Sequence, residues 1–513
     1  MRGLGHNNYL GKILNARVYE VSKETPLQYA SVLSGQLRNT VHLKREDLQP
    51  VHSFKIRGAY NKIAQLSREQ LKAGVVACSA GNHAQGVALS ATALETDAVI
   101  VMPKGTPGIK VDAVRKRGAT VLLHGDNYDE AQAEAMRLVE LEGRTLIHPF
   151  DDPLVIAGQG TIGMEILKQM TGKRLDAIFV CCGGGGMLAG VAAYVKRVRP
   201  DVMVIGVEAS DAAGMTTSIR AGQRTSLDSV GLFADGAAVK TVGAETFRIC
   251  NELVDDMVTV TTDEICAAIK DGFMDTRCVL EPAGALAIAG VRRWVALTNA
   301  RDQTYVVTAS GANMDFDRLR FVSERADSSE THVSVVIPER PGAFKSLIEH
   351  IFPRNVTEFS YRMSDGGSRG AAVFFSFQAQ GTNTADKAAD AESLIRTMRS
   401  GGLDVTDLGK NELARCHLRS VGGGRANVPH ERLIRFEFPE RPGALSHFLD
   451  SMEQCGTWNV SLFQYRNHGA DIGRVLAGLQ VPPSEEAELD RWLGQLGYTF
   501  YHETDNIVAK LFL

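Results

Sequence analysis

Short apolar runs alternate with longer amphipathic stretches between about residues 20 and 320. The runs are uniformly apolar and rich in β-branched residues, which is typical of strands that are buried on both faces. They lie at residues 75–78, 98–102, 120–123, 177–180, 202–207 and 305–308. Stretches of helical length separate them, among them 82–93, 129–141 and 187–197. This rhythm predicts βαβ units, and therefore an α/β fold built on a mainly parallel sheet.

The last third of the chain has a different pattern, and the pattern occurs twice. The block ERPGAF at 339–344 recurs as ERPGAL at 440–445, and NVTEFSYR at 355–362 recurs as NVSLFQYR at 459–466. Apolar residues alternate before each first block, as in half-buried strands, and follow it at helical spacing. Each copy therefore predicts a small βαββαβ module. The expected domains are 1–325, 331–405 and 431–505.

Composition and charge narrow the functional class. A chain of 513 residues is too long for one ordinary core, and its net charge of −4 argues against a partner rich in phosphates, such as nucleic acid. The eight cysteines form no C-x-x-C pair, so no metal site is predicted. Residues 1–30 lack the apolar core of a signal peptide, and no apolar run is long enough to cross a membrane. These features predict a cytoplasmic protein without a membrane partner.

Two motifs suggest a single cofactor. Lys55 follows Phe54 and precedes Gly58, and a glycine run, Gly183–Gly186, directly follows an apolar strand. A lysine beside an aromatic ring suits covalent chemistry on an aldehyde, and a row of free backbone N–H groups at a helix start suits a phosphate. Pyridoxal phosphate carries both groups. In parallel sheets ligands bind at the carboxyl ends of strands, where Asn82 and Ser310 are also expected.

Each motif has a simpler explanation. Asn82 can cap the helix that follows it, Glu281 can cap the helix after Pro282, and His83 is more often structural than catalytic. The spacing Gly184-x-Gly186, with Glu208 at the end of the next strand, resembles a dinucleotide fingerprint and leaves an NAD(P)-dependent oxidoreductase as an alternative. A non-catalytic amino-acid sensor is a third possibility.

Taken together, the motifs SFK at 53–55, SAGNHAQG at 79–86, GGGGM at 183–187, EPAGA at 281–285 and SGAN at 310–313 resemble the serine/threonine dehydratases, which are fold type II pyridoxal phosphate enzymes like the β subunit of tryptophan synthase. With two modules related to ACT domains, the whole chain is similar to the biosynthetic threonine ammonia-lyases of that family. The resemblance implies β-elimination that converts L-threonine, and less readily L-serine, to a 2-oxo acid and ammonia. For threonine the product is 2-oxobutanoate, the committed step toward isoleucine. It also implies inhibition by isoleucine, relief by valine and a homotetramer.

The resemblance also implies roles for single residues. Lys55 would hold the cofactor as a Schiff base and move the proton of the substrate Cα. The cofactor would further contact Phe54, Asn82, Gly183, Gly184, Gly185, Gly186, Met187 and Ser310. The substrate would contact Ser79, Ala80, Gly81, His83 and Glu281. Related racemases carry a serine where this chain has Ala80, which argues against racemisation. The effector site would involve Phe359, Tyr361, Arg362, Phe463, Tyr465 and Arg466.

Overall fold

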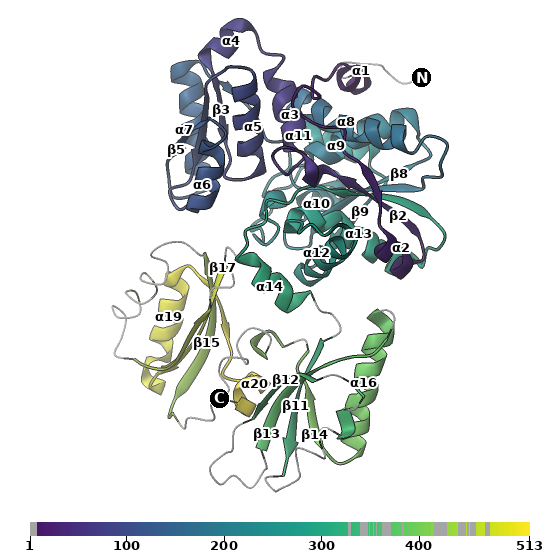
Figure 1. The fold of residues 1–513 in the computed structure, drawn as a ribbon. Helices are drawn as coiled ribbons and strands as arrows, with labels where there is room; N and C mark the ends of the chain where they lie inside the picture. The colour runs from purple at the N-terminus through teal and green to yellow at the C-terminus, as the bar shows by residue number, and fades with distance from the viewer. Residues whose placement is uncertain are drawn as a thin grey trace. The chain divides into compact units, whose positions relative to one another are not determined.

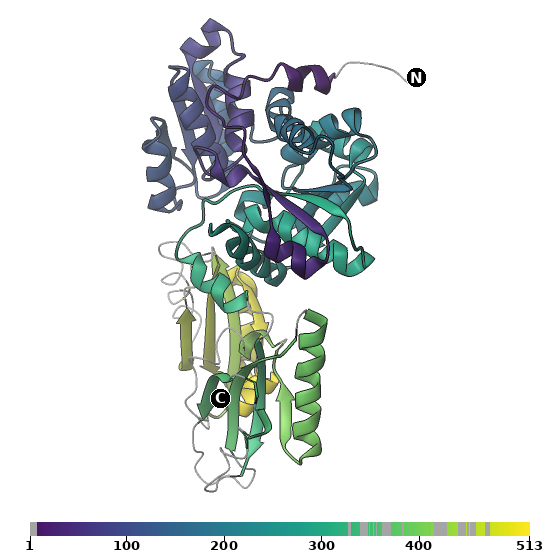
Figure 2. The same ribbon diagram turned by 45° about the vertical axis from the view of Figure 1, so that its right-hand side comes forward.

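A computed structural model describes residues 8–326 and, beyond them, 330–338, 347, 349–351, 353–354, 356–361, 371–381, 384–409, 411–414, 428–439, 448, 451, 458–466 and 472–512. The chain divides into two compact units, Met1–Ala326 and Asp327–Leu513. Figures 1 and 2 show the described parts of both as ribbons. Among the described helices, none combines the length and apolarity that crossing a membrane requires.

The first unit contains two sheets (Figure 1). The larger has the order β1-β2-β10-β7-β8-β9 and is parallel except for the β1–β2 pair. The smaller has the order β5-β4-β3-β6 and is parallel throughout. The strands are β1 (Leu27–Tyr29), β2 (Thr40–Arg45), β3 (Val75–Cys78), β4 (Ala98–Met102), β5 (Thr120–Leu123), β6 (Thr145–Leu146), β7 (Ala177–Cys181), β8 (Met203–Ala209), β9 (Asp256–Val260) and β10 (Thr304–Ala309).

Helices connect these strands and cover the sheets, as the alternating pattern predicts. They are α1 (Tyr9–Leu14), α2 (Ser31–Leu37), α3 (Lys55–Ile63), α4 (Arg68–Ala73), α5 (Asn82–Ala93), α6 (Gly108–Arg115), α7 (Tyr128–Glu142), α8 (Pro153–Gln169), α9 (Gly186–Val198), α10 (Gly214–Ala221), α11 (Ala244–Leu253), α12 (Thr262–Thr276), α13 (Pro282–Thr298) and α14 (Arg318–Arg325). Two 3-10 turns lie in the connecting loops: η1 (Glu46–Leu48) follows β2, and η2 (Asp235–Ala237) lies between α10 and α11. The predicted α/β class, all six predicted strands and the three predicted helices are confirmed.

The uniform hydrophobicity of the strands follows from burial on both faces. In β3, Val75 and Ala77 belong to one apolar cluster, which includes Ala84 of α5, whereas Val76 belongs to a second cluster on the opposite face, with Ala131 of α7. A strand covered by helices on both sides needs apolar residues at every position. The polar ends of such strands are therefore where functional groups can be placed.

A buried ion network joins α3 to the sheet. Arg57, in α3, pairs with Glu46 of η1 at 2.7 Å and with Glu165 of α8 at 2.6 Å. Lys44 of β2 pairs with Glu165 at 2.6 Å, and all four side chains are almost completely buried. Gly158 of α8 lies so close to α3 that a Cβ there would come within 2.6 Å of the Arg57 carbonyl oxygen. Close backbone contact and ion pairing together fix α3 against α8.

The second unit contains two four-stranded antiparallel sheets with the same order, β12-β13-β11-β14 and β16-β17-β15-β18. The elements are β11 (Glu330–Ile337), β12 (Val356–Tyr361), β13 (Ala371–Gln378), α16 (Thr384–Ser400) and β14 (Asp404–Asp407), then β15 (Glu431–Pro439), β16 (Asn459–Arg466), β17 (Ile472–Gln480), η4 (Pro483–Glu485), α19 (Glu486–Leu496), β18 (Thr499–His502) and α20 (Ile507–Phe512). The four strands of the predicted βαββαβ module are thus present twice. The first predicted helix of each copy falls largely outside the described residues, although Leu347, Ile351 and Phe448 are helical and buried.

Each module has its own core, and a third cluster joins the two. Phe375 of β13 packs in the first core and Val475 of β17 in the second. The neighbouring residues Phe374 and Leu476 instead enter a shared cluster with Leu433 of β15. Because successive residues of a strand point to opposite faces, each sheet packs on its own helix with one face and contributes to the shared cluster with the other.

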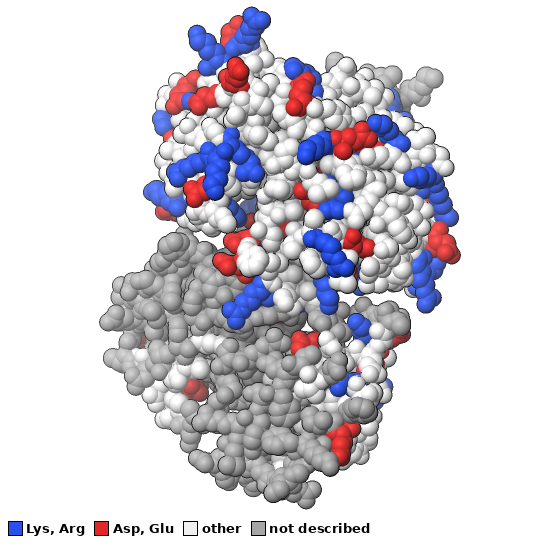
Figure 3. Space-filling model, in the orientation of Figure 1, with Lys and Arg blue, Asp and Glu red and all other residues white. Residues whose placement is uncertain are grey.

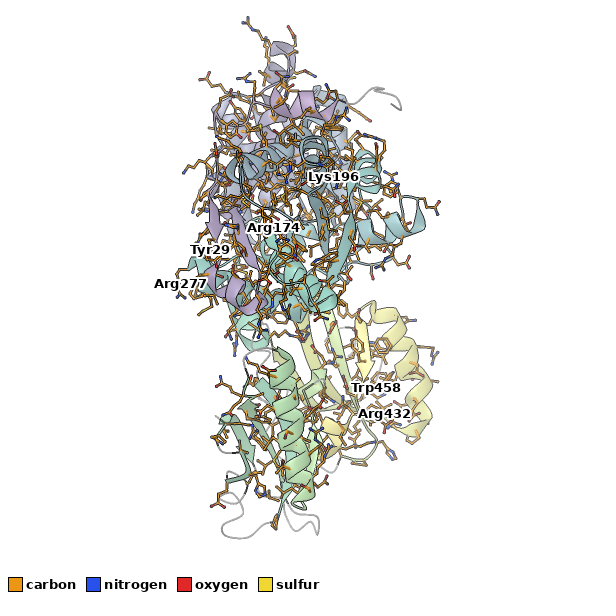
Figure 4. The ribbon with its side chains drawn as sticks, turned by 90° about the vertical axis from the view of Figure 1, so that its right-hand side faces the viewer. Tyr29, Arg174, Lys196, Arg277, Arg432 and Trp458 are labelled. Atoms are coloured by element: carbon orange, nitrogen blue, oxygen red, sulfur yellow. The ribbon has the colours of Figure 1, made fainter. Side chains whose placement is uncertain are left out.

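One ion pair and one indole hydrogen bond connect the second module to the start of α19. Trp458 donates its indole N–H to Glu485 at 2.7 Å, and Arg432 pairs with Glu486, the first residue of α19 (Figure 4). Acidic side chains are favourable at a helix N-terminus, where the backbone dipole is positive. On the first unit, acidic and basic side chains are interspersed over the face seen in Figure 3.

Candidate active site

Lys55 is the first residue of α3, directly after Phe54 at the N-cap position. Its Nζ donates a hydrogen bond to the carbonyl oxygen of Pro149 at 3.0 Å and lies 5.4 Å from the centre of the Phe54 ring. Burial lowers the pKa of Lys55 to about 8, because an ammonium ion loses hydration there. A lysine with such a pKa supplies a neutral amine near neutral pH, as attack on an aldehyde requires.

The loop before Lys55 runs beside the loop that follows β10. Ser53 forms an antiparallel bridge with Gly311, and the Phe54 backbone N–H donates to the Ser310 carbonyl oxygen at 3.2 Å. The Ser310 hydroxyl donates to the carbonyl oxygen of Ala283, in the first turn of α13, at 3.3 Å. These bonds bring Lys55 and Ser310 together from sequence positions far apart.

Asn82 does not cap its helix. The N-cap position of α5 belongs to Gly81, and no side chain caps that end. The Asn82 amide instead donates to Glu281 Oε1 at 2.5 Å, and its Oδ1 accepts from Asn313 Nδ2 at 2.6 Å. The capping alternative for Asn82 is therefore wrong, and its amide belongs to a polar network in the site.

Glu281 occupies the N-cap position of α13, as the Glu-Pro pair predicts, but its side chain caps no backbone N–H. Burial, and after it the negative charge of Asp235, raises the pKa of Glu281 to about 7. This carboxyl group changes its protonation state near neutral pH. A buried carboxyl group with a strongly shifted pKa is characteristic of functional sites.

The remaining residues of the 79–83 loop occupy the start of α5. Ser79 Oγ accepts from the Gly81 N–H at 3.3 Å, and no atom outside the local chain lies within 4 Å of a Cβ built on Gly81. His83 Nε2 contacts the Ile147 carbonyl oxygen at 2.7 Å, so this nitrogen carries the proton. Burial, assisted by the charge of Lys55, lowers the pKa of His83 to about 3 and keeps the ring neutral.

The glycine run forms the turn between β7 and α9. Gly185 is the N-cap residue, with φ of 96°, and no side chain caps the helix. A Cβ on Gly184 would overlap the ring of Phe150, and one on Gly183 would lie 2.9 Å from Ala237 Cα. No side chain caps the N–H groups of this helix start, which include that of Met187, and uncapped N–H groups at a helix start are favourable partners for an anion such as phosphate.

Contacts connect all of these groups. Pro149, which accepts from Lys55, precedes Phe150, which packs on the glycine run, and Ala237 connects that run to Gly236 beside Glu281. The residues fit pyridoxal phosphate: they combine a desolvated lysine, an uncapped helix start for the phosphate and a hydroxyl at Ser310. Sequence reasoning missed Phe150 and the Asp235–Ala237 turn, which carry no periodic or motif signal.

Glu208 does not have the role that a dinucleotide site requires of its acidic residue, which is to bind the ribose. It is completely buried, and its carboxylate accepts from the backbone N–H groups of Met215 and Thr216 and from the Thr216 hydroxyl, all at 2.6–2.8 Å. These partners lie at the start of α10, so Glu208 fixes that helix. The observation that suggested an NAD(P) site therefore has a structural explanation.

The predicted effector residues lie in equivalent strands. Phe359 and Tyr361 are in β12, where they pair with Phe375 and Val373 of β13. In the second module Phe463, Tyr465 and Arg466 are in β16 and pair with Ala477, Val475 and Arg474 of β17. Arg362 lies outside the described residues. Both sets follow a register shift in their strand, between Val356 and Glu358 and between Val460 and Leu462.

Comparison with known proteins decides the family. The model of pyridoxal-phosphate dependent enzymes matches residues 19–311, and that of the C-terminal regulatory domain of threonine dehydratase matches 323–418 and 422–513. The biosynthetic L-threonine dehydratase of Burkholderia multivorans is 52% identical over 99% of this chain and 100% of its own length. This chain belongs to the threonine dehydratase family. The relative from Escherichia coli K12 is 47% identical over 98% of this chain and 97% of its own length.

Solved structures agree with this assignment. The processed form of threonine deaminase isoform 2 from Solanum lycopersicum is 50% identical, with a TM-score of 0.61 over 62% of this chain and 92% of that chain. A serine racemase from Dictyostelium discoideum is 32% identical, with a TM-score of 0.56 over 60% of this chain and 99% of that chain. The predicted fold class, the pyridoxal phosphate cofactor and the threonine ammonia-lyase assignment are confirmed.

Proposed function

We propose that this threonine dehydratase releases ammonia and 2-oxobutanoate from L-threonine at the site around Lys55, and that isoleucine bound to the second unit inhibits it. The observation that carries the proposal is the desolvated Lys55 amine, which bonds to Pro149 next to the Phe150 ring that packs on the glycine run. Further contacts connect that run to the Asn82–Glu281 pair, and the neighbouring Phe54 to Ser310. When bound, pyridoxal phosphate supplies an electron sink that acidifies the substrate Cα–H and permits loss of the β-hydroxyl.

Separate residues of the chain have separate roles in this reaction. Lys55 would hold the cofactor through its Nζ and, once the substrate has released it, would take the proton of the substrate Cα. Its pKa of about 8 suits this exchange near neutral pH. The backbone N–H groups of Gly183–Met187 would bind the phosphate, and Phe54 would lie beside the cofactor ring.

Ser310 determines which reaction follows. We assign its hydroxyl to the pyridine nitrogen, where it is too weak an acid to keep that nitrogen protonated. With that nitrogen unprotonated, prompt loss of the substrate β-hydroxyl would be favoured. The loop 79–83 binds the substrate carboxylate, with the uncapped start of α5 providing N–H groups. Ala80 offers no proton to the opposite face of Cα, which disfavours racemisation despite the similarity to serine racemases.

The other parts of the proposal concern regulation and assembly. We assign catalysis to residues 1–325 and two ACT-like modules to 331–405 and 431–505. Phe359, Tyr361, Arg362, Phe463, Tyr465 and Arg466 are proposed to form or support the effector site, with valine opposing isoleucine. A cytoplasmic homotetramer that also accepts L-serine completes the proposal.

A keto-acid assay tests this function directly. Purified holoenzyme is incubated with L-threonine or L-serine, with and without isoleucine, and the 2-oxo acid is quantified. We expect 2-oxobutanoate from threonine, a lower rate with serine, suppression by isoleucine and no product from Lys55→Ala. Formation of D-amino acid instead of 2-oxo acid, or full activity of Lys55→Ala, would contradict the proposal.

A further inference from the structure

The turn η2, Asp235–Ala237, is part of the candidate site, although nothing in its sequence marks it. A Cβ built on Gly236 would lie 3.7 Å from Glu281 Oε1 and 3.8 Å from Asn82 Nδ2. On its other side Ala237 touches the glycine run at Gly183. The turn thus fills the space between the Asn82–Glu281 pair and the start of α9. A displacement of η2 would therefore change the packing around both.

Asp235 connects this turn to two distant segments. Its Oδ2 pairs with Lys110 Nζ of α6 at 2.9 Å, and its Oδ1 lies 3.4 Å from Nη1 of Arg318, the first residue of α14. Arg318 is only 5% exposed and also donates to the Phe233 carbonyl oxygen at 3.4 Å. The charge of Arg318 is the largest of those that lower the pKa of Asp235, ahead of the charge of Lys110, so a movement of Arg318 alters the environment of this carboxylate.

Arg318 stands at a position in the chain that connects this contact to the second unit. Helix α14 is the last helix of the first unit, which ends at Ala326, and β11 of the second unit begins at Glu330. A rotation or shift of α14 moves Arg318 relative to Asp235. Lys110 belongs to α6 and has no such connection to the second unit along the chain.

Charges around Glu281 make the site sensitive to such a movement. Burial and then Asp235 raise the pKa of Glu281, whereas Asn82, Lys110 and Arg318 lower it. Lys55 and Cys181 also face this carboxyl group. With a pKa near 7, Glu281 gains or loses a proton near neutral pH when one nearby charge moves.

We propose that Asp235 is a positioning residue through which helix α14 regulates the candidate site: isoleucine binding in the second unit draws Arg318 away from Asp235, so that Lys110 alone pairs with Asp235 and Glu281 experiences a less compensated negative charge. The inference rests on the proposed function and adds a route for its regulation. Withdrawal of Arg318 favours protonated Glu281 and loosens η2 against Asn82. The affinity for threonine falls as a result.

Two variants test the electrostatic part, because their effects have opposite signs. Asp235→Asn removes the negative charge and should move the Glu281-dependent limb of the kcat/KM pH profile to lower pH. Arg318→Gln removes the compensating cation and should move the same limb to higher pH. Arg318→Lys keeps the charge and should restore the wild-type profile. Shifts in the same direction, or unchanged profiles, would overturn the proposal.

A matched control tests the regulatory part. Arg325, also in α14, pairs with Asp263 at 3.0 Å, so Arg325→Gln breaks an ion pair of the same helix without touching Asp235. Isoleucine should change the apparent KM for threonine in the wild type and in Arg325→Gln, within the roughly 5–150-fold range usual for allosteric coupling. In Arg318→Gln the change should shrink toward onefold. Equal responses of the two variants would refute the role of Arg318.

A calorimetric measurement gives a readout that does not depend on turnover or on the folding of the Arg318 variants. Isoleucine is titrated into wild-type holoenzyme near pH 7 in buffers of different ionisation enthalpy. We expect net proton uptake, which Glu281→Gln abolishes; absence of uptake, or its persistence in Glu281→Gln, would overturn the inference. A wild type that forms no 2-oxobutanoate would instead contradict the proposed function itself.

Discussion

Replacement of Arg57 by methionine should strongly destabilise the first unit. The substitution leaves Glu46 and Glu165 buried, with Lys44 as the cation that still pairs in their network. Breaking a buried pair by removing one partner costs about 3–5 kcal/mol, because an uncompensated charge remains in a medium of low polarity. We expect a loss of this size from Arg57→Met. The effect should reach the active site, because Arg57 follows Lys55 by two positions in α3.

An exposed ion pair provides the matched control. Arg17 and Glu20 pair at 3.1 Å with side chains that are 52% and 45% exposed, so Arg17→Met should cost less than about 1 kcal/mol. Urea unfolding followed through the cofactor absorbance gives both values from the shift in midpoint multiplied by the slope. Equal losses for the two variants would show that burial of the network contributes nothing.

The same variants should differ in acid sensitivity. Burial opposes ionisation of Glu46, but the adjacent Arg57 outweighs it and lowers the pKa of this carboxyl group below its usual value. A lowered folded-state pKa gives stability that is present above the unfolded pKa, about 4.3, and is lost as pH falls through the folded value. Arg57→Met should therefore unfold with a weaker dependence on pH below about 4.3 than the wild type.

Three further outcomes are expected. Lys55→Ala should lose the absorbance of the covalently bound cofactor and reduce 2-oxobutanoate formation by at least about 10²–10⁴-fold, as measured by spectroscopy and keto-acid assay. Gly184→Ala places a methyl group in the Phe150 ring and should cost about 1–3 kcal/mol, seen as a lower urea midpoint and weaker cofactor binding. Glu281→Gln should remove a step with a pKa of about 7 from the pH profile of kcat/KM, and a step that persists would place the titrating group elsewhere.

Local pattern was enough to predict much of the fold. The strands at 75–78 and 98–102 are uniformly apolar because helices cover both faces of their sheet, and that pattern needs no tertiary information. By contrast, β2 at Thr40–Arg45 contains His42, Lys44 and Arg45 and does not resemble a buried strand. Lys44 is buried because Glu165, far along the chain, pairs with it. Sequence pattern cannot reveal such a compensation.

The candidate site was predictable where one segment carries the chemistry. Lys55, the glycine run and Ser310 lie in motifs whose meaning is local. The partner of Asn82 was not predictable, because the choice between a helix cap and a bond to Glu281 depends on how α5 and α13 approach one another. Phe150 and Asp235 escaped notice for the same reason, since packing alone assigns them to the site.

The apolar cluster built from Phe374, Leu433 and Leu476 limits how the gene can be shortened. A chain truncated after the first module would expose the apolar face of that module's sheet to water, and exposed apolar patches promote aggregation. Removal of both modules removes every described residue of this cluster, so no part of it is left exposed. Viable truncations should therefore discard the pair as a whole, and the two copies are bound to persist or disappear together.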